Sequence, residues 1–398
     1  MKILILSHKP PYPIADGGCL AMSRLLSDLL ALEKVSQVTY HTLSTHKHPF
    51  QKEAFPKHPK LELSAQQIDT RVRISGALFA LLRQESYNLV RFKDAKVLAA
   101  LQKELSVTTY DFVLFESLFA AVYAAPLRNF SKAHFIYRAH NIEHQIWKDL
   151  ASNTKSLLKK WYLHQLAYAL KWAERSIWSE DQGALDLILT ISHTDLHQIE
   201  AQTLTTCKHL PASIDQTTNQ SNCAPMKMCF LGAFNWYPNI EAVNWFLDRV
   251  FADLQAKHPT LEFHIAGKDA EQFKHWLRPG VLVHGFVPDA KKFIAENGIF
   301  VGCLQSGSGV KMKILEAMSV GAPLVLSRKS ADGLPQLDTD LIKTNENDFK
   351  QDLLQLLQYP QHLEARSAYF KQYFKNHFES IQVRKQLQSV LDELQNNR

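Results

Sequence analysis

Short apolar runs alternate with longer segments of helical periodicity along most of the chain. In the first half, the apolar runs predict strands at residues 3–6, 38–43, 112–115, 134–137 and 187–191. The segments between them keep helical spacing, most clearly at about 19–32 and 157–178. Strands separated by helices form parallel sheets that are covered on both faces, so the pattern predicts an α/β, doubly wound fold.

The same alternation begins again near Met226. It predicts strands at residues 228–231, 261–266, 281–284, 299–304 and 323–326, with a helix at 239–254. Residues 205–225 include a polar stretch that can bury little surface, which is typical of an interdomain linker. We therefore expect a Rossmann-like domain at 1–215, a second one at 216–378 and a terminal helix at 379–398.

The terminal segment places its apolar residues on one helical face, and we expect that face to dock, with the N-terminal domain as the candidate partner. Those residues are Val383, Leu387, Val390, Leu391 and Leu394. Two such domains leave an interdomain cleft between them. Doubly wound folds bind ligands beyond the carboxyl ends of their strands, so functional residues are expected in the loops that follow strands and face the cleft.

Composition supports a folded two-domain protein. The chain has 398 residues, of which 46% are hydrophobic and 21% charged, which excludes disorder, collagen-like repeats and a coiled coil. The formal net charge is +6. Residues 1–100 hold 14 Lys and Arg against 8 Asp and Glu, so the whole excess lies in the first quarter of the chain.

The cysteines and the N-terminus indicate a cytoplasmic protein. None of the five cysteines forms a CxxC pair, and an odd count suits free thiols in a reducing compartment. The apolar run after Met1 is too short for a signal peptide and is interpreted as the first strand. No stretch approaches the roughly 18 apolar residues of a membrane span.

Two segments that follow predicted strands contain glycines where a helix begins. Gly17 and Gly18 follow the first strand, allow close approach of a ligand to the backbone, and precede a helix N-terminus that favours an anion. Residues 305–316 pass through Gly307, Ser308 and Gly309 into a helix expected to begin near Val310. An ordinary loop and a helix cap with a surface glutamate are the competing interpretations.

The second of these segments carries the stronger chemistry. We expect this turn to bind a pyrophosphate. Its backbone N–H groups are exposed, and Lys311 and Lys313 lie just inside the helix. Glu316 lies further along the same helix, where a carboxylate can accept from a pair of ribose hydroxyls. The single Gly307-x-Gly309 spacing lacks the third glycine of a dinucleotide fingerprint.

Two more loops after strands are rich in polar or aromatic residues. Arg138, His140, Asn141 and Glu143 follow the strand at 134–137, and their density favours function over a structural histidine. Gly232 begins an aromatic turn, residues 232–239, which either lines a nucleotide pocket or packs in the core.

Together these motifs resemble the retaining glycosyltransferases of family 4, which have two facing Rossmann-like domains in the GT-B architecture. The resemblance covers essentially the whole chain, and its most specific part is residues 307–323. It implies that Glu316 holds the nucleotide ribose, that Gly17 and Gly18 approach the donor phosphates or the acceptor, and that His140 contacts the donor sugar near the reacting carbon. The other donor-binding candidates are Asn141, Gly232, Ser308, Gly309, Lys311 and Lys313, with Arg138 and Glu143 on the acceptor side or in support.

The sequence also departs from the family pattern. Ser308 stands where the family often has a first glutamate, and residues 233–236 lack the usual basic pair. Lys311 and Lys313 are therefore the candidates for neutralising the leaving pyrophosphate, with Lys268 as a second choice. Asp338 and Asp340 spell DxD, but we assign no metal and no cofactor, because any acidic turn gives this pattern.

The resemblance implies a hexosyltransferase that moves a sugar from a nucleoside-diphosphate sugar to a hydroxyl with retention, in glycan or glycolipid biosynthesis. A sugar-nucleotide epimerase and a non-catalytic binding protein are the alternatives. The basic first quarter favours a glycan, lipid-linked or other anionic acceptor, or a lipid surface, over nucleic acid. Residues 71–96, with arginines around an apolar run, predict either a peripheral contact with the inner face of a membrane or a buried helix.

Overall fold

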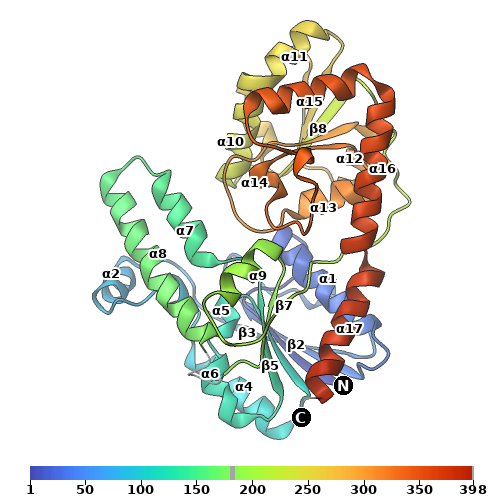
Figure 1. Ribbon diagram of the computed structural model, residues 1–398. Helices are drawn as coiled ribbons and strands as arrows, with labels where there is room; N and C mark the ends of the chain where they lie inside the picture. The colour runs from blue at the N-terminus through green and yellow to red at the C-terminus, as the bar shows by residue number, and fades with distance from the viewer. Residues whose placement is uncertain (180–183, 397–398) are drawn as a thin grey trace. The chain divides into compact units, whose positions relative to one another are not determined.

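The structure is a computed structural model that describes residues 1–179 and 184–396. The chain divides into two compact units, labelled by element in Figure 1. The first unit is Met1–Ala212 together with the chain from Arg384 onward, and the second is Ser213–Val383. Each unit is a parallel sheet with flanking helices, as the alternating pattern predicts.

The first unit has a seven-stranded sheet in the order β3-β2-β1-β4-β5-β6-β7, with every neighbouring pair parallel. The strands are β1 Lys2–Ser7, β2 Gln37–Ser44, β3 Leu61–Gln67, β4 Phe112–Glu116, β5 His134–Ala139, β6 Leu187–Thr190 and β7 Cys207–His209. The five predicted strands are confirmed. The edge strands β3 and β7 were not predicted, because a half-exposed edge and a three-residue strand show no continuous apolar run.

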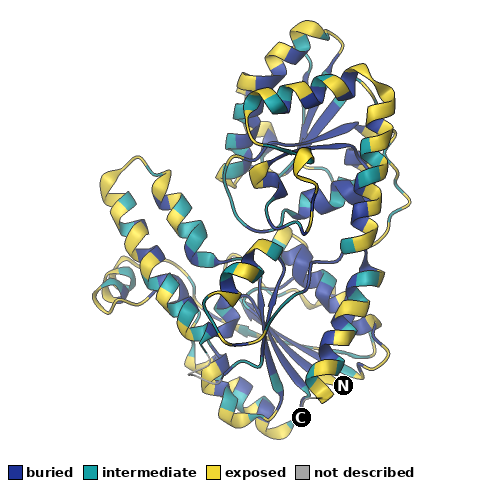
Figure 2. Ribbon diagram, viewed as in Figure 1, coloured by how far each residue is buried: buried dark blue, intermediate teal, exposed yellow. Residues whose placement is uncertain are grey.

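The helices of the first unit lie between these strands. They are α1 Gly17–Ala31, α2 Ile74–Leu82, α3 Tyr87–Val90, α4 Ala95–Val107, α5 Leu118–Ala121, α6 Ala124–Leu127, α7 Glu143–Ser152, α8 Leu157–Trp178 and α9 His193–Glu200. The core contains Val113, Phe115, Phe135 and Tyr137 from β4 and β5, and Leu170 and Trp178 from α8. Buried residues follow the strands in Figure 2, whereas exposed ones lie on the outer helix faces.

The second unit has a six-stranded parallel sheet in the order β10-β9-β8-β11-β12-β13. Its strands are β8 Lys227–Leu231, β9 Glu262–Ala266, β10 Val281–Gly285, β11 Ile299–Gly302, β12 Leu324–Ser327 and β13 Ile342–Lys343. Five were predicted, but β11 ends two residues early. There the N–H of Leu304 donates to Ser330 Oγ at 3.1 Å instead of joining the ladder.

The helices of the second unit are α10 Tyr237–Phe246, a π-helical turn Leu247–Phe251, α11 Ala252–Lys257, α12 Ala290–Glu296, α13 Met312–Ser319, α14 Arg328–Ala331, α15 Glu346–Gln358 and α16 Pro360–His377. The predicted helix at 239–254 corresponds to α10, the π turn and α11 in succession. Helix α13 begins two residues later than expected, because Gly307 and Gly309 hold positive φ angles of 103° and 70° in the turn before it.

The terminal helix α17 spans Ser380–Asn396; residues 397–398 of the predicted segment lie outside the described residues. From Arg384 onward it is part of the first unit. Ion pairs join Arg384 to Asp28 at 3.9 Å and Lys34 to Asp392 at 2.8 Å, and Lys208 pairs with Glu393. Within residues 1–179 and 184–396, no helix combines the length and apolar character needed to cross a bilayer.

Gly232, after β8, and Gly267, after β9, allow the two loops to approach each other closely. Gly267 has a φ of 138°, and a Cβ added to it would lie 1.9 Å from the carbonyl oxygen of Gly232. Gly285, at the end of β10, also has positive φ, but a Cβ there would meet only the Glu271 carboxylate at 3.2 Å. The approach of Gly267 to Gly232 therefore requires the absence of a side chain.

We expect Gly267→Ala to lower the unfolding free energy of the second unit by about 3 kcal/mol, because strain and a backbone clash act together. Gly285→Ala is the matched control and loses about 1 kcal/mol, since only its left-handed φ is strained. Urea unfolding followed by tryptophan fluorescence measures both. Equal losses in the two variants would show that the clash at Gly267 is relieved by a backbone shift.

Candidate functional site

The first unit carries a buried ion-pair cluster at the carboxyl ends of β4 and β5. Glu116 and Arg138 are register partners on these strands, and both side chains are 1% exposed. Arg138 Nη1 lies 3.0 Å from Glu116 Oε1 and 3.2 Å from the carbonyl oxygen of Ala21 on α1. His140 Nε2 lies 2.5 Å from Glu116 Oε2. A carboxylate only accepts, so Nε2 carries a proton and Glu116 fixes the orientation of the imidazole.

The charge on Glu116 is maintained by its neighbours. Burial raises the pKa of this carboxyl, but the charges of Arg138 and His140, and the hydrogen bonds they donate, outweigh burial and leave the pKa below its ordinary value. The cluster therefore holds a buried carboxylate that presents His140 at the end of the sheet. The sequence predicted Arg138 and His140 but missed Glu116. The available signal was a charged residue directly after the apolar run 112–115.

His8 lies at the end of β1 and extends this group. Its Nδ1 lies 2.7 Å from Ser117 Oγ, and its ring centroid lies 5.6 Å from that of Phe119 and 6.2 Å from that of Phe92. Burial, with the charges of Lys9 and His140, lowers its pKa to about 3, so His8 is neutral at pH 7. This histidine was not among the predicted site residues, although it directly follows the first strand.

Gly17 and Gly18 form the first turn of α1, whose N-cap is Asp16. The Asp16 carboxylate accepts from the N–H of Cys19 at 2.8 Å and pairs with Lys9 Nζ at 2.5 Å. Burial alone would raise the pKa of Asp16, but Lys9 lowers it to about 2. This helix N-terminus thus already has a carboxylate of its own, and the predicted anion-binding role of the two glycines stays a prediction.

Glu174 of α8 organises the loop that carries His140 and Asn141. Its carboxylate accepts from the backbone N–H groups of Glu143 at 2.8 Å and His144 at 3.1 Å, and it lies 2.5 Å from His144 Nδ1. It therefore caps α7 from a neighbouring helix, which sequence reasoning missed because the residues are 31 positions apart. Burial, with the charges of Glu174 and Asp195, raises the pKa of Glu143 to about 8, so this carboxyl is largely neutral at pH 7.

The second unit presents a lysine at the end of its sheet. Lys313 Nζ donates to Asn239 Oδ1 at 2.7 Å and lies 4.0 Å from the centroid of the Phe230 ring. Asn239 also donates to the carbonyl of Ala233 at 2.8 Å, and a Cβ on Gly232 would lie 2.8 Å from its Cγ. Burial and, to a lesser extent, the charge of Lys311 lower the pKa of Lys313 to about 7.

The turn before α13 combines a buried hydroxyl with a helix start that has no side-chain cap. Lys311 is the N-cap, and its side chain accepts no hydrogen bond from the first turn of α13. The N–H of Ile314 donates to the Lys311 carbonyl at 2.8 Å. The Ser308 hydroxyl is buried and has no hydrogen-bond partner in the part of the chain that the structure describes. Lys311 Nζ donates to the carbonyl of Gly309 and lies 3.9 Å from Asp332. Glu316 lies half-buried three residues after Lys313, on the neighbouring turn.

The remaining predicted residues have simpler surroundings. Lys268 is exposed, and its carbonyl accepts from the N–H of Phe234 at 2.8 Å. The Asp338 carboxylate caps the short 3₁₀ turn Thr339–Leu341 by accepting from the N–H of Asp340. Among the described residues, no group of three or more His, Cys, Asp or Glu side chains is arranged to hold a metal ion. All five cysteines are free thiols, as predicted.

The structure thus forms two groups from the predicted residues. Arg138 and His140 meet through Glu116 in the first unit, with Asn141 in the loop that follows and Glu143 at the start of α7. In the second unit, Gly232 packs against Asn239, which binds Lys313. The turn of Ser308, Gly309 and Lys311 leads into the helix of Lys313 and Glu316.

The chain resembles known proteins in sequence and in fold. Residues 225–359 match the family model described as glycosyl transferases group 1. A Klebsiella pneumoniae protein, the "Uncharacterized 44.6 kDa protein in cps region", is 24% identical over 333 residues, which span 80% of each chain.

Several solved structures resemble the whole chain. HepE of Anabaena, in complex with UDP and glucose, has a TM-score of 0.64 at 12% identity over 99% of this chain and 100% of that one. The lipopolysaccharide outer core galactosyltransferase WaaB has a TM-score of 0.60 at 15% identity over 99% of each chain. TarM of S. aureus, in complex with UDP and other ligands, has a TM-score of 0.64 at 11% identity over 98% of this chain and 99% of that one.

These likenesses show that the chain has the GT-B fold, which confirms the predicted fold class. The family match in the second unit, together with this fold, supports a GT-B glycosyltransferase.

We expect Glu116→Gln to lower the unfolding free energy at pH 7 by about 3–5 kcal/mol, because Arg138 is left buried without a counter-charge. The folded-state pKa of Glu116 is lowered, so its stabilisation is present above the ordinary carboxyl pKa and is lost as pH falls through the lowered value. The variant loses this dependence. Urea unfolding from pH 7 to pH 3 tests both effects, with the exposed Glu33→Gln as control. An unchanged acid profile in Glu116→Gln would contradict the assignment.

Proposed function

We propose that the chain is a retaining glycosyltransferase of the family 4 type that moves a hexose from a nucleoside-diphosphate sugar to an acceptor hydroxyl in glycan or glycolipid biosynthesis. The observation that carries this proposal is the uncapped N-terminus of α13, with the unpartnered Ser308 hydroxyl before it and Lys313 and Glu316 within it. A helix N-terminus with a lysine suits an anion, and a carboxylate such as Glu316 suits a vicinal diol. HepE and TarM, which share the fold, were solved in complex with UDP.

We assign the donor diphosphate to the N–H groups at the start of α13 and to Lys311 and Lys313. Glu316 is assigned to the ribose hydroxyls, because a carboxylate accepts from both members of a diol. Ser308 replaces the family's usual glutamate, and its buried hydroxyl needs a partner that the donor sugar or phosphate can supply. These groups lie on one turn and one helix, so a bound donor meets them together.

The reaction needs stabilisation of the negative charge that develops on the leaving diphosphate. In the proposed step, the bond between the anomeric carbon and the diphosphate oxygen breaks, and the acceptor oxygen bonds to that carbon on the same face. The acceptor proton passes to the leaving phosphate oxygen. Lys311, Lys313 and the helix N–H groups stabilise the charge electrostatically, and we propose that no metal ion is required for this role.

In the first unit we assign His140 to the donor sugar near its reacting carbon. Glu116 holds the His140 imidazole through Nε2, so Nδ1 is the ring nitrogen that we assign to the donor sugar. Asn141 is assigned to the same sugar, while Arg138 acts through Glu116 and Glu143 through its place at the start of α7. Gly17 and Gly18 remain candidates for the phosphates or the acceptor. The basic excess of residues 1–100 favours an anionic or lipid-linked acceptor.

Glu316→Ala is expected to lower turnover of a nucleotide-sugar at least about 100-fold, because the ribose loses its acceptor while the fold persists. Sugar transfer and slow donor hydrolysis are measured over a panel of donors and acceptors. Glu364→Ala, an exposed carboxylate on α16, is the matched control and keeps wild-type rates. Full activity in Glu316→Ala would refute the donor-site assignment, and conversion of the donor sugar without an acceptor would favour an epimerase.

Donor affinity is expected to weaken as pH rises through about 7, because Lys313 loses its charge there. Calorimetry with UDP-glucose is suitable, since its diphosphate is a diester of constant charge over this range. The expected change between pH 6 and pH 8.5 is up to about tenfold in Kd, equal to one pKa unit of interaction. Lys313→Arg removes this slope, because a guanidinium stays protonated. The same slope in wild type and in Lys313→Arg would mean that another group titrates.

A further inference from the structure

Helix α2 leaves most of its apolar side chains in contact with water. Of its nine residues, only Ala80 is buried. The exposed fractions of Ile74 and Leu82 are 88% and 76%, and Val72, Leu78 and Phe79 are also exposed. Ala80 and Ala77 pack with Tyr87 and Leu166, which fixes the helix against α8. The alternative prediction, a buried helix in this segment, is therefore wrong.

Helix α8 carries a second exposed apolar face. Leu157 and Leu158 at its start are 83% and 78% exposed, and Trp161, Tyr168 and Trp172 are each more than half exposed. Residues 157, 161, 168 and 172 lie on one side of a helix, because their spacings of four, seven and four match its period. Tryptophan and tyrosine, with an apolar ring and a polar atom, are the side chains that favour a membrane–water interface.

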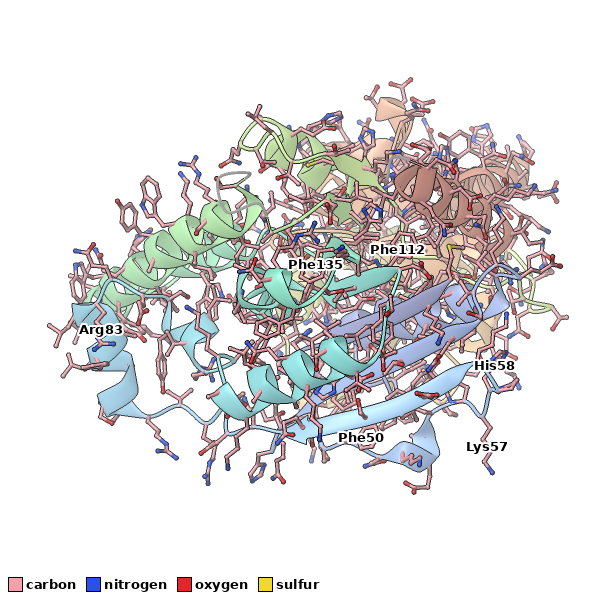
Figure 3. The ribbon with its side chains drawn as sticks, turned by 90° about the horizontal axis from the view of Figure 1, so that it is seen from below. Phe50, Lys57, His58, Arg83, Phe112 and Phe135 are labelled. Atoms are coloured by element: carbon pink, nitrogen blue, oxygen red, sulfur yellow. The ribbon has the colours of Figure 1, made fainter. Side chains whose placement is uncertain are left out.

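A groove joins the two helices. It has a volume of about 330 Å³ and is lined by Ala77 and Leu81 of α2, by Gln84 just after α2, and by Tyr162, Leu166 and Tyr168 of α8. Tyr168 belongs both to the groove and to the exposed face of α8. In Figure 3, Arg83 marks the end of α2, beside α8 at the outer edge of the first unit. The apolar faces of α2 and α8 therefore adjoin one another.

The charged side chains around these faces are mostly cationic. Residues 71–83 contain three arginines and no acid, and residues 153–173 contain Lys155, Lys159, Lys160 and Lys171 and no acid. Asp69 pairs with Arg71 at 2.9 Å and with Arg73 at 2.8 Å, and Glu85 lies at the groove. Arg83 and the lysines of residues 155–160 remain as the cationic groups beside the exposed leucines and Trp161.

We propose that α2 and the exposed face of α8, the α2/α8 surface, dock on an anionic phospholipid bilayer. Apolar and aromatic side chains insert at the level of the headgroups, and the flanking cations attract the negatively charged lipids. An anionic bilayer is the partner that matches the charge of this surface, because the surface combines cations with apolar side chains and has few carboxylates. Through this surface the proposed glycosyltransferase reaches a lipid-linked acceptor, and that role of the surface rests on the proposed function.

Flotation with vesicles tests this directly. Wild-type chain is expected to float with phosphatidylcholine vesicles that contain about 30% phosphatidylglycerol, to float much less with pure phosphatidylcholine, and to lose binding at high salt. Leu78→Asp with Leu82→Asp removes apolar insertion, and Lys159→Glu with Lys160→Glu reverses the charge. Each pair is expected to lower the bound fraction at least about tenfold.

The matched control pair is Val107→Asp with Lys103→Glu, which makes the same kinds of change at exposed positions on α4 and is expected to float as wild type does. The proposal is overturned if wild type does not float with anionic vesicles, if it binds neutral vesicles equally well, or if the control loses binding to the same extent. Concentration-dependent dimerisation that the Leu78 and Leu82 changes abolish, without flotation, would assign the surface to a second copy instead.

Donor hydrolysis in the same variants separates this inference from the proposed function. Hydrolysis of a nucleotide-sugar in solution is expected to stay within about twofold of wild type, because the changed side chains lie outside the candidate donor site. A chain that floats but never turns over a donor refutes the glycosyltransferase and leaves the membrane surface standing. A chain that turns over donor but does not float refutes the membrane surface alone.

Discussion

The contacts of the Glu116 carboxylate, buried beside Arg138 and His140 at the end of the first sheet, are the interaction on which the candidate site of that unit depends. Arg138 reaches it from the neighbouring strand, and His140 reaches it from the loop beyond. A buried charge is tolerated only when it is paired, so the three side chains must stay together. The contact of Arg138 with the Ala21 carbonyl includes α1 in the same constraint. Strand register and the position of His140 are therefore fixed by one set of contacts.

In the second unit, the candidate site is positioned by a close approach between two backbone segments and by an aromatic ring beside Lys313. Gly267 touches the carbonyl of Gly232, which shapes the loop after β8 and places Asn239 beside Lys313. The Phe230 ring lies beneath the lysine, and burial lowers the pKa of its amine to about 7. A cation that is close to losing its proton responds strongly to an arriving anion. The uncapped start of α13 adds fixed dipoles to the same place.

Much of the fold was readable from periodicity, because strands buried on both faces give continuous apolar runs. The central strands of both sheets show this, and helical spacing likewise predicted the helix at 157–178. Edge strands β3, β7 and β13 gave no such signal, since they are short or half-exposed and are stabilised by pairing with a distant segment. The early start of α1 and the late start of α13 reflect capping and glycine dihedrals, which periodicity does not encode.

The sequence by itself determined the α/β class, the two-domain division of the pattern and the short segments that contain most of the candidate site residues, because these follow from local patterns of apolar, polar and glycine residues. Only the tertiary structure decided that Glu116 joins Arg138 to His140, that Glu174 caps α7 and that Lys313 rests on Phe230. It also decided that α2 is exposed and not buried. These outcomes depend on partners that the chain brings together from distant positions, and burial and pKa follow from those partners and not from residue type alone.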